Sequence, residues 1–175
     1  MDDTTRLLLA ARDGDRDAFA EFVRRTQPEV HRLCRALGSP ATADDLTQET
    51  YLRAMRSLGR FGGRSSARTW LLAIARNVAA DDIRRRGARH RMLQRLDGPP
   101  ETVASPGAAV HTADLLAGLH PDRRDAFALT QLLGLSYAEA AEVLDCPVGT
   151  IRSRVARARE DLVEALRDAR SEETG

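Results

Sequence analysis

The sequence predicts an all-α fold made of two small helical domains. Only 4% of the 175 residues are aromatic while 42% are hydrophobic, so a core must be built from Leu, Ala, Val and Ile, which favours helices. Apolar residues recur at helical spacing on both sides of a stretch rich in Gly and Pro. We therefore expect domains at residues 1–95 and 113–175, joined by a flexible linker at 96–112.

The first strongly periodic segment runs from Phe19 to Leu37. Pro28 interrupts it, and proline inside a helix removes a hydrogen bond and clashes with the preceding turn. Thr26 and Glu29 have the spacing of a capping box around this proline. We expect either a kink or a stop and restart of the helix at this point.

The next predicted helix begins at Ser39-Pro40 and covers "ATADDLTQETYLRAMRSL". Placing the residues at helical steps gives a buried stripe of Thr47, Tyr51, Ala54 and Leu58. The opposite face carries carboxylates around one apolar side chain and comprises Asp45, Glu49, Leu52 and Arg56. This face is either a docking patch for a partner or an ordinary solvated helix face.

The glycine-rich loop "GRFGGRSSA" precedes a third helix, "RTWLLAIARNVAADDIRRRGARHR". Between Trp70 and Ala80 this helix is apolar almost all round, so it should be central to its domain. Residues 59–95 hold ten Arg and two Asp, an excess that the net charge of +1 hides. Such a basic segment points to a nucleic-acid partner, and a solvated basic face is the alternative.

The C-terminal part has the pattern of a helix-turn-helix. Helical segments "ADLLAGL" and "PDRRDAFALTQLLG" come first, and Ser136 with Glu139 then forms a capping-box pattern before a short helix. A break at Asp145-Cys146-Pro147 separates this helix from a longer one.

The longer helix has one buried and one small-residue face. Its apolar stripe is Ile151, Val155, Ala158, Leu162 and Leu166, and the opposite ridge is Gly149, Ser153, Ala156 and Glu160. Arg152, Arg157 and Arg159 flank the ridge, and Arg154 lies nearer the core. The DNA major groove is about 12 Å wide and a helix about 10–12 Å across, so small residues at the centre suit entry into the groove. A charged amphipathic helix without a nucleic-acid partner is the alternative.

Several classes of function lack support in the sequence. There is no nucleophile–base arrangement, phosphate-binding glycine loop or metal cluster, so we expect no enzyme, no cofactor and no metal. His31 with Cys34 supplies too few ligands for zinc, and Cys34 and Cys146 suggest no disulfide framework. No apolar run reaches about 18 residues and no signal peptide is evident, so we expect a cytoplasmic protein without membrane insertion.

Two segments together resemble the extracytoplasmic-function (ECF) sigma factors of the sigma-70 family, the small two-domain subunits that direct bacterial RNA polymerase to promoters. "LSYAEAAEVLDCPVGTIRSRVARARE" is similar to the region 4 helix-turn-helix, and residues 44–86 are similar to region 2, a helical bundle. The resemblance covers residues 15–166, and the sequence of these segments is most similar to the mycobacterial sigma factor C type. Pro28 and Ala156 depart from the usual pattern.

The resemblance implies roles for individual residues. Docking on the clamp helices of the largest polymerase subunit maps to Asp45, Gln48, Glu49, Leu52 and Arg53. Recognition of the −10 element, including a flipped base, maps to Arg60, Phe61, Gly62, Gly63, Arg64, Ser65, Arg76, Asn77, Arg84 and Arg85. Recognition of the −35 element maps to Gly149, Thr150, Arg152, Ser153, Ala156 and Arg157. We expect Trp70 in the core, and a wedge that helps to melt DNA is the alternative. Asp81 shares the helix face of Trp70, so we expect a buried carboxylate paired with an arginine. Arg86 and Arg89 would add phosphate contacts.

The expected partners follow from the same resemblance. They are core RNA polymerase, including the flap region of its second largest subunit, promoter DNA and an anti-sigma factor. A stand-alone helix-turn-helix regulator that does not bind polymerase is the alternative. The acidic patch around Leu52 distinguishes the two, because a repressor does not need it.

Overall fold

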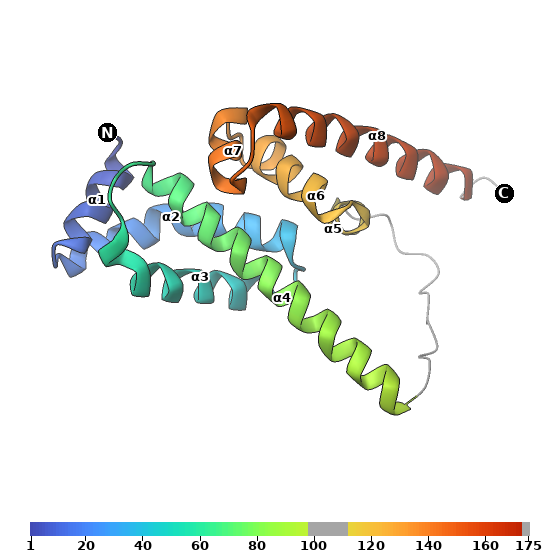
Figure 1. The fold of residues 1–175 in the computed structure, drawn as a ribbon, viewed down its shortest axis with the longest axis horizontal. Coiled ribbons are helices and arrows are strands. Elements are labelled where there is room, and N and C mark those ends of the chain that lie inside the picture. The colour runs from blue at the N-terminus through green and yellow to red at the C-terminus, as the bar shows by residue number, and fades with distance from the viewer. Residues whose placement is uncertain (98–111, 173–175) are drawn as a thin grey trace.

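The protein is helical in every regular element that the computed structural model describes, which covers residues 1–97 and 112–172 (Figure 1). The all-α prediction is confirmed. The predicted linker lies outside the described residues apart from its ends, which belong to helices. The elements are α1 (Asp3–Arg12), α2 (Arg16–Leu37), α3 (Ala43–Ser57), the 3₁₀ turn η1 (Leu58–Arg60), α4 (Ala67–Asp97), α5 (Thr112–Gly118), α6 (Pro121–Phe127), the π-helical turn η2 (Ala128–Leu132), α7 (Tyr137–Leu144) and α8 (Val148–Glu172).

Helix α1 is fastened to the start of α4 by its N-terminal hydrogen bonds. The Asp2 carboxylate accepts the backbone N–H of Thr5 at 2.9 Å, and the Thr5 hydroxyl accepts the N–H of Ala67 at 2.9 Å. Partial burial of Asp2 raises its pKa, but the hydrogen bonds from Thr4 and Thr5 outweigh this effect and lower the pKa to about 2. The N-cap therefore links two segments that are distant in the chain.

Helix α2 passes through Pro28 without a break, so the predicted stop and restart is wrong. The Thr26 hydroxyl donates to the Phe22 carbonyl at 2.7 Å, and Glu29 pairs with Arg68, so the expected capping box does not form. Packing of α2 against α3 and α4 holds the helix across the proline.

The start of α3 also differs from the prediction. The cap position is Thr42 rather than Ser39, because the two hydroxyls bond each other at 3.0 Å within a turn. Gly38 precedes this turn, and a Cβ there would lie 2.9 Å from the Cys34 carbonyl oxygen and 2.6 Å from the Leu46 side chain. The close approach of the backbone at the end of α2 therefore favours glycine at this position.

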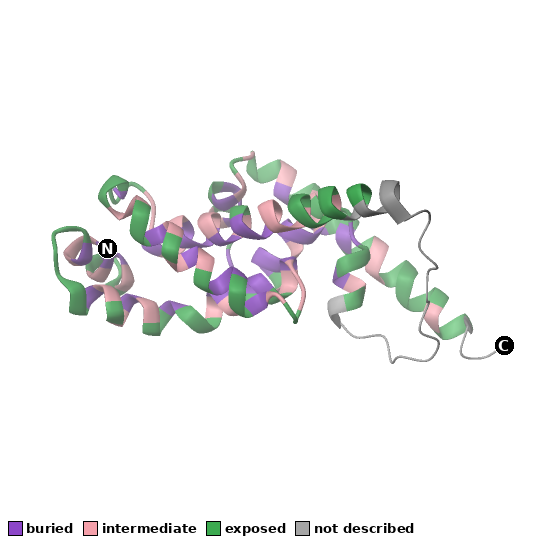
Figure 2. Cartoon of the chain, turned by 90° about the horizontal axis from the view of Figure 1, so that it is seen from below, coloured by how far each residue is buried: buried purple, intermediate pink, exposed green. Residues whose placement is uncertain are grey.

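Helix α4 is the central element, as predicted. Leu71, Leu72, Ala75, Val78 and Ala79 are all buried, and the purple segments of Figure 2 follow this helix through the molecule. Helix α4 contacts α1, α2 and α3 on one side and α7 on the other. Its apolar character on most faces is explained by these neighbours.

The two predicted domains pack against each other. Buried residues of both halves form one contiguous core, and α2 contacts α5 while α4 contacts α7. Arg68 of α4 makes a hydrogen bond between the halves, since it donates to the Leu133 carbonyl at 2.9 Å. Glu29 of α2 accepts from the same guanidinium at 2.9 Å and holds it in place. The halves share an interface that the sequence analysis did not predict.

The C-terminal half is a helix-turn-helix built from α7 and α8. The capping box is confirmed, because the Ser136 N–H donates to the Glu139 carboxylate at 2.8 Å and the Glu139 N–H donates to the Ser136 hydroxyl at 3.2 Å. The tight turn places Asp145 at a φ of 47°, a left-handed conformation that ends α7.

The predicted buried stripe of α8 is confirmed only in its first turns. Ile151, Val155 and Ala158 are buried and Leu162 is half-buried, but Leu166 is 42% exposed. The prediction is wrong for Leu166 because the last turns of α8 extend beyond the helices that cover its first half (Figure 1). The apolar period continues where no neighbouring helix remains to cover it.

Candidate nucleic-acid and protein interfaces

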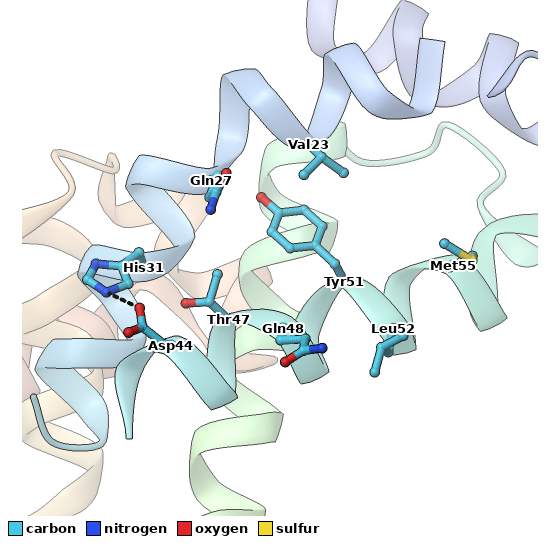
Figure 3. Close-up of a pocket in the computed structure, with 9 residues that line it drawn as sticks. All are labelled: Val23, Gln27, His31, Asp44, Thr47, Gln48, Tyr51, Leu52 and Met55. Carbon is cyan, nitrogen blue, oxygen red and sulfur yellow. Dashed lines mark ion pairs between the residues drawn. The ribbon is translucent and has the colours of Figure 1, made fainter. Parts of the chain in front are cut away.

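A groove of about 350 Å³ lies between α2 and α3, and we call it the α2–α3 groove (Figure 3). Helix α3 contributes Leu52 and Met55, which are 40% and 56% exposed. Helix α2 contributes Val23 and His31, and the His31 ring lies 3.1 Å from the Asp44 carboxylate across the groove. The groove thus offers exposed apolar surface next to carboxylates on a rigid helix pair.

Tyr51 holds the floor of this groove. Its hydroxyl bonds the Thr26 hydroxyl at 2.8 Å, which links α3 to α2. Burial raises the pKa of Tyr51 to about 12, although the hydrogen bond with Thr26 opposes this effect. The phenol therefore stays neutral and keeps the two helices in register.

Of the residues predicted to dock on polymerase, Asp45, Gln48 and Leu52 are exposed, whereas Glu49 and Arg53 are engaged within the fold. Arg53 donates to Glu49 at 2.7 Å and to Asp81 of α4 at 2.6 Å. The hydrogen bonds to Arg53 and Arg84 hold the pKa of Asp81 below its usual range. Asp81 is therefore paired as expected, but its side chain is 32% exposed rather than buried.

The acidic face of α3 adjoins the basic end of α4. Asp45 and Glu49 line a cavity of about 420 Å³ together with Arg85, Arg86 and Arg89. The residues predicted for polymerase docking and those predicted for phosphate contacts therefore meet at one edge of the N-terminal half.

The loop before α4 presents most of its predicted DNA-binding residues to solvent. Arg60, Gly62, Gly63 and Arg64 are exposed, and Gly63 has a φ of 68° that favours glycine. Phe61 differs, because its ring is only 3% exposed and lies 5.2 Å from the Trp70 ring. The Phe61 ring belongs to the core together with the half-buried Trp70, so it is not available here to stack on a base.

On α4 the predicted −10 residues have different surroundings. Asn77 and Arg85 are exposed. Arg76 is half-buried and its Nε donates to Asp125 of α6 at 2.8 Å, and Arg84 pairs with Asp81. The guanidinium of Arg76 is therefore bonded to the C-terminal half in this structure and does not face solvent freely.

The predicted −35 residues form one continuous surface on the first half of α8. Gly149, Arg152, Ser153, Ala156 and Arg157 are exposed, and Thr150 is half-buried. A Cβ added to Gly149 would meet nothing within 4 Å, so this end of the ridge is open.

The arginines beside the ridge of α8 fall into a half-buried one and exposed ones, as the helical wheel indicates. Arg154 donates to Asp122 at 2.8 Å and is half-buried, whereas Arg159 is exposed and donates to Gln131 at 2.8 Å. Arg152 and Arg157 make no hydrogen bond or ion pair within the described part of the chain. These two guanidinium groups are the ones free to reach an external partner.

Sequence reasoning missed half of the α2–α3 groove. It assigned docking to α3 alone, while His31, Val23 and Gln27 of α2 form the second wall. Met55 could have been found, because it follows Leu52 by three residues and thus lies one turn further on the same face. The wall from α2 needed the pairing of the two helices, which no local pattern encodes.

Other kinds of site have no support in residues 1–97 and 112–172. No described group of three or more His, Cys, Asp or Glu residues could bind a metal ion. No described helix combines the length and apolar character needed to cross a bilayer. Both cysteines are free, with Cys34 in the core and Cys146 half-buried.

Comparison with known proteins gives two family matches. Residues 22–89 match the model of sigma-70 region 2, and residues 112–162 match the model of sigma-70 region 4. The ECF RNA polymerase sigma factor SigC of Mycobacterium tuberculosis is 50% identical over 167 residues, which cover 91% of this chain and 89% of that protein. The ECF RNA polymerase sigma-E factor of Haemophilus influenzae is 34% identical over 170 residues, which cover 88% of this chain and 90% of that protein.

Solved structures agree with these matches. CnrH in complex with the cytosolic domain of CnrY has a TM-score of 0.73 at 31% identity, and the match covers 95% of this chain and 99% of that one. The sigma factor RpoE in complex with the anti-sigma factor NepR, from Bartonella quintana, has a TM-score of 0.69 at 31% identity, with coverage of 85% and 96%. The chain belongs to the ECF family of RNA polymerase sigma factors.

Proposed function

We propose that the α2–α3 groove binds core RNA polymerase, that the loop and exposed face of α4 read the −10 element, and that the first half of α8 reads the −35 element. The observation that carries this proposal is the exposure of Leu52 and Met55 in a groove that Asp44 also lines. An apolar patch rimmed by charge is typical of a protein-binding surface, and DNA binding does not require one.

The groove fits an amphipathic helix with a basic rim. Helices dock into apolar grooves through side chains spaced one turn apart, and Leu52 and Met55 supply apolar surface over such a turn. Asp44, Asp45 and Gln48 surround the apolar surface and would face basic side chains of the partner. The clamp helices of the largest polymerase subunit are the partner we propose.

For the −10 element we propose Arg60, Arg64 and Ser65 of the loop together with Asn77 and Arg85 of α4. Asn77 offers an amide donor and acceptor on an exposed turn, which suits the edge of an extruded base. Gly62 and Gly63 allow close backbone approach, and Arg84 adds a cation next to Arg85 on α4. Arg76 can hold a phosphate only after Asp125 releases it.

For the −35 element we propose that the exposed ridge of α8 enters the major groove. Gly149, Ser153 and Ala156 leave room for the bases, while Arg152 and Arg157 reach guanine edges or phosphates. Thr150 lies at the N-terminal end of the ridge, where a hydroxyl can contact a phosphate.

We further propose that the chain is a specificity subunit without catalytic activity, acting in the cytoplasm with polymerase and promoter DNA. Regions 1–95 and 113–175 would act as separate promoter-reading modules, and the flap of the second largest subunit would hold the second. An anti-sigma factor is an additional candidate partner, because RpoE of Bartonella quintana was solved with one.

The docking proposal is tested by charge reversal at Asp45 together with a new positive charge at Gln48. Both are exposed and make no hydrogen bond within the described residues, so D45R/Q48R should leave the fold intact. We expect the double variant to lose co-purification with core polymerase, while R152Q, which alters the α8 surface, should retain it. Unchanged co-purification of D45R/Q48R would reject this docking site, and failure of the unmodified chain to co-purify would favour the stand-alone regulator.

A further inference from the structure

Arg124 is an almost buried cation without a counter-charge in contact. The residue is 8% exposed, its Nε is buried without a hydrogen-bond partner, and its guanidinium makes no ion pair within the described residues. Burial lowers the pKa of Arg124, and the charge of Arg86 lowers it further, while Asp125 acts in the opposite direction. Isolated buried charges are costly, so a structure normally pairs them.

The same guanidinium lines a cavity of about 170 Å³ between the two halves of the protein. Helix α4 contributes Arg76 and Arg84, and α6 contributes Arg124 and Asp125. The remaining walls are largely apolar and include Ile83. Three arginines and one carboxylate therefore line a pocket whose other walls are largely apolar, and Arg84 is paired with Asp81, which does not line it.

The single carboxylate is already engaged. Asp125 accepts from Arg76 at 2.8 Å and its side chain is 7% exposed. Burial raises the pKa of Asp125, and the hydrogen bond from Arg76 opposes this effect. Asp125 therefore satisfies Arg76 and leaves the positive charge of Arg124 without a bonded partner.

We propose that this cavity is a binding site for a phosphate group. Asp125 pairs with Arg76 and Asp81 pairs with Arg84, so Arg124 is the lining cation that lacks a bonded counter-charge. A phosphate group, which carries about −1.5 to −2 at neutral pH, would supply that counter-charge. Guanidinium groups bind phosphate oxygens through paired N–H donors, and Arg124 has such donors to offer. The apolar walls strengthen this attraction because they keep water away.

The size of the cavity limits what can enter. An engineered cavity of about 150 Å³ holds a benzene molecule, so this cavity has room for a phosphate group but not for a nucleoside. Inorganic phosphate would enter whole, and a nucleotide would insert only its terminal phosphate. Because the walls come from both α4 and α6, the bound group would link the two halves.

The test is calorimetric titration of the full chain with inorganic phosphate and, in a second arm, with a nucleoside diphosphate, at ionic strength balanced with chloride. R124Q should weaken phosphate binding by about tenfold or more. R56Q is the matched control, because Arg56 is exposed on α3 and makes no hydrogen bond or ion pair in the described part of the chain. Tighter binding of the nucleotide, with the same Arg124 dependence, would assign the group to a nucleotide.

Thermal melting provides an independent reading. In phosphate-free buffer the melting temperature of R124Q should be higher than that of the unmodified chain, because the substitution removes an uncompensated buried charge. Added phosphate should raise the melting temperature of the unmodified chain but not that of R124Q. A80E places a carboxylate at the cavity wall, so it should melt higher than A80Q and lose its response to phosphate.

The proposal is overturned by any of three results. They are no saturable phosphate binding by the unmodified chain, equal binding by R124Q, and an equal loss in R56Q, which would indicate general attraction to arginine. These readings need neither polymerase nor promoter DNA, so they are independent of the proposed sigma function.

Discussion

Truncation of the two exposed apolar side chains in the α2–α3 groove should weaken binding to core polymerase without harming the fold. In L52A/M55A both new residues are strong helix formers, and the replaced residues are 40% and 56% exposed. The buried share of the two side chains should lower the free energy of unfolding by about 1.6–3.1 kcal/mol, which is less than the total of about 5–15 kcal/mol typical of a folded domain. Polymerase affinity should fall because the partner loses the apolar surface that it covers.

The size of the effect follows from the exposed fractions. Complete burial of an exposed Leu or Met side chain is worth about 1.5–3 kcal/mol. Leu52 has 40% of its surface left to bury, which gives about 0.6–1.2 kcal/mol, and Met55 has 56%, which gives about 0.8–1.7 kcal/mol. The combined loss of about 1.4–2.9 kcal/mol corresponds to a decrease in affinity of about 10- to 100-fold.

The assay is fluorescence anisotropy of the labelled chain titrated with purified core polymerase. M92A/V148A is the control, since these side chains are also exposed apolar groups, 65% and 41% respectively, but lie outside the groove. The control should bind within about twofold of the unmodified chain. Equal binding by L52A/M55A and the unmodified chain would show that the groove is not the docking surface.

Three further outcomes are expected. R157A should reduce discrimination of the −35 element by about 1–3 kcal/mol in competition binding with mutated promoters; an unchanged preference would reassign Arg157 to phosphate contact. S136A should lower the free energy of unfolding by about 1 kcal/mol through loss of the cap. The hydrogen bond from the Ser136 side chain lowers the pKa of Glu139 in the folded protein, so the stabilisation by this bond is present above the unfolded pKa of Glu139 and is lost as pH falls through the folded pKa. In denaturant titrations the loss of unfolding free energy in S136A should therefore become smaller in acid. A loss that does not change with pH would contradict this linkage. Y51F should lower the free energy of unfolding by about 0.5–1.5 kcal/mol in the same titrations, because the Thr26 hydroxyl loses a hydrogen-bond partner. It should also remove the ionisation of a tyrosine near pH 12 from a spectroscopic pH titration. No change in either measurement would place Tyr51 outside the α2–α3 contact.

Local patterns in the sequence predicted the elements whose determinants are themselves local. The Ser136–Glu139 capping box and the buried positions Ile151 and Val155 were correctly predicted because each depends on residues within a few turns. Pro28 was misread because the tertiary contacts of α2 with α3 and α4 outweigh the local cost of a proline. Leu166 was misread because periodicity does not reveal where the covering helices end.

The candidate site was predictable in identity but not in geometry. The exposed ridge of α8 follows from the helical wheel alone, and the exposed residues match it. The pairing of Arg53 with Asp81 and of Arg76 with Asp125 joins residues 28 and 49 positions apart, so no spacing rule could reveal it. The same holds for the interface between the two halves, which depends on shape and charge complementarity between distant helices.

The most direct test of the central claim is in vitro transcription with purified core polymerase and a library of bacterial promoter fragments. The account predicts that adding the chain starts transcripts at defined sites, that these starts share −10 and −35 sequences, and that D45R/Q48R starts none. Specific binding of the chain to DNA without any new transcript from core polymerase would contradict it.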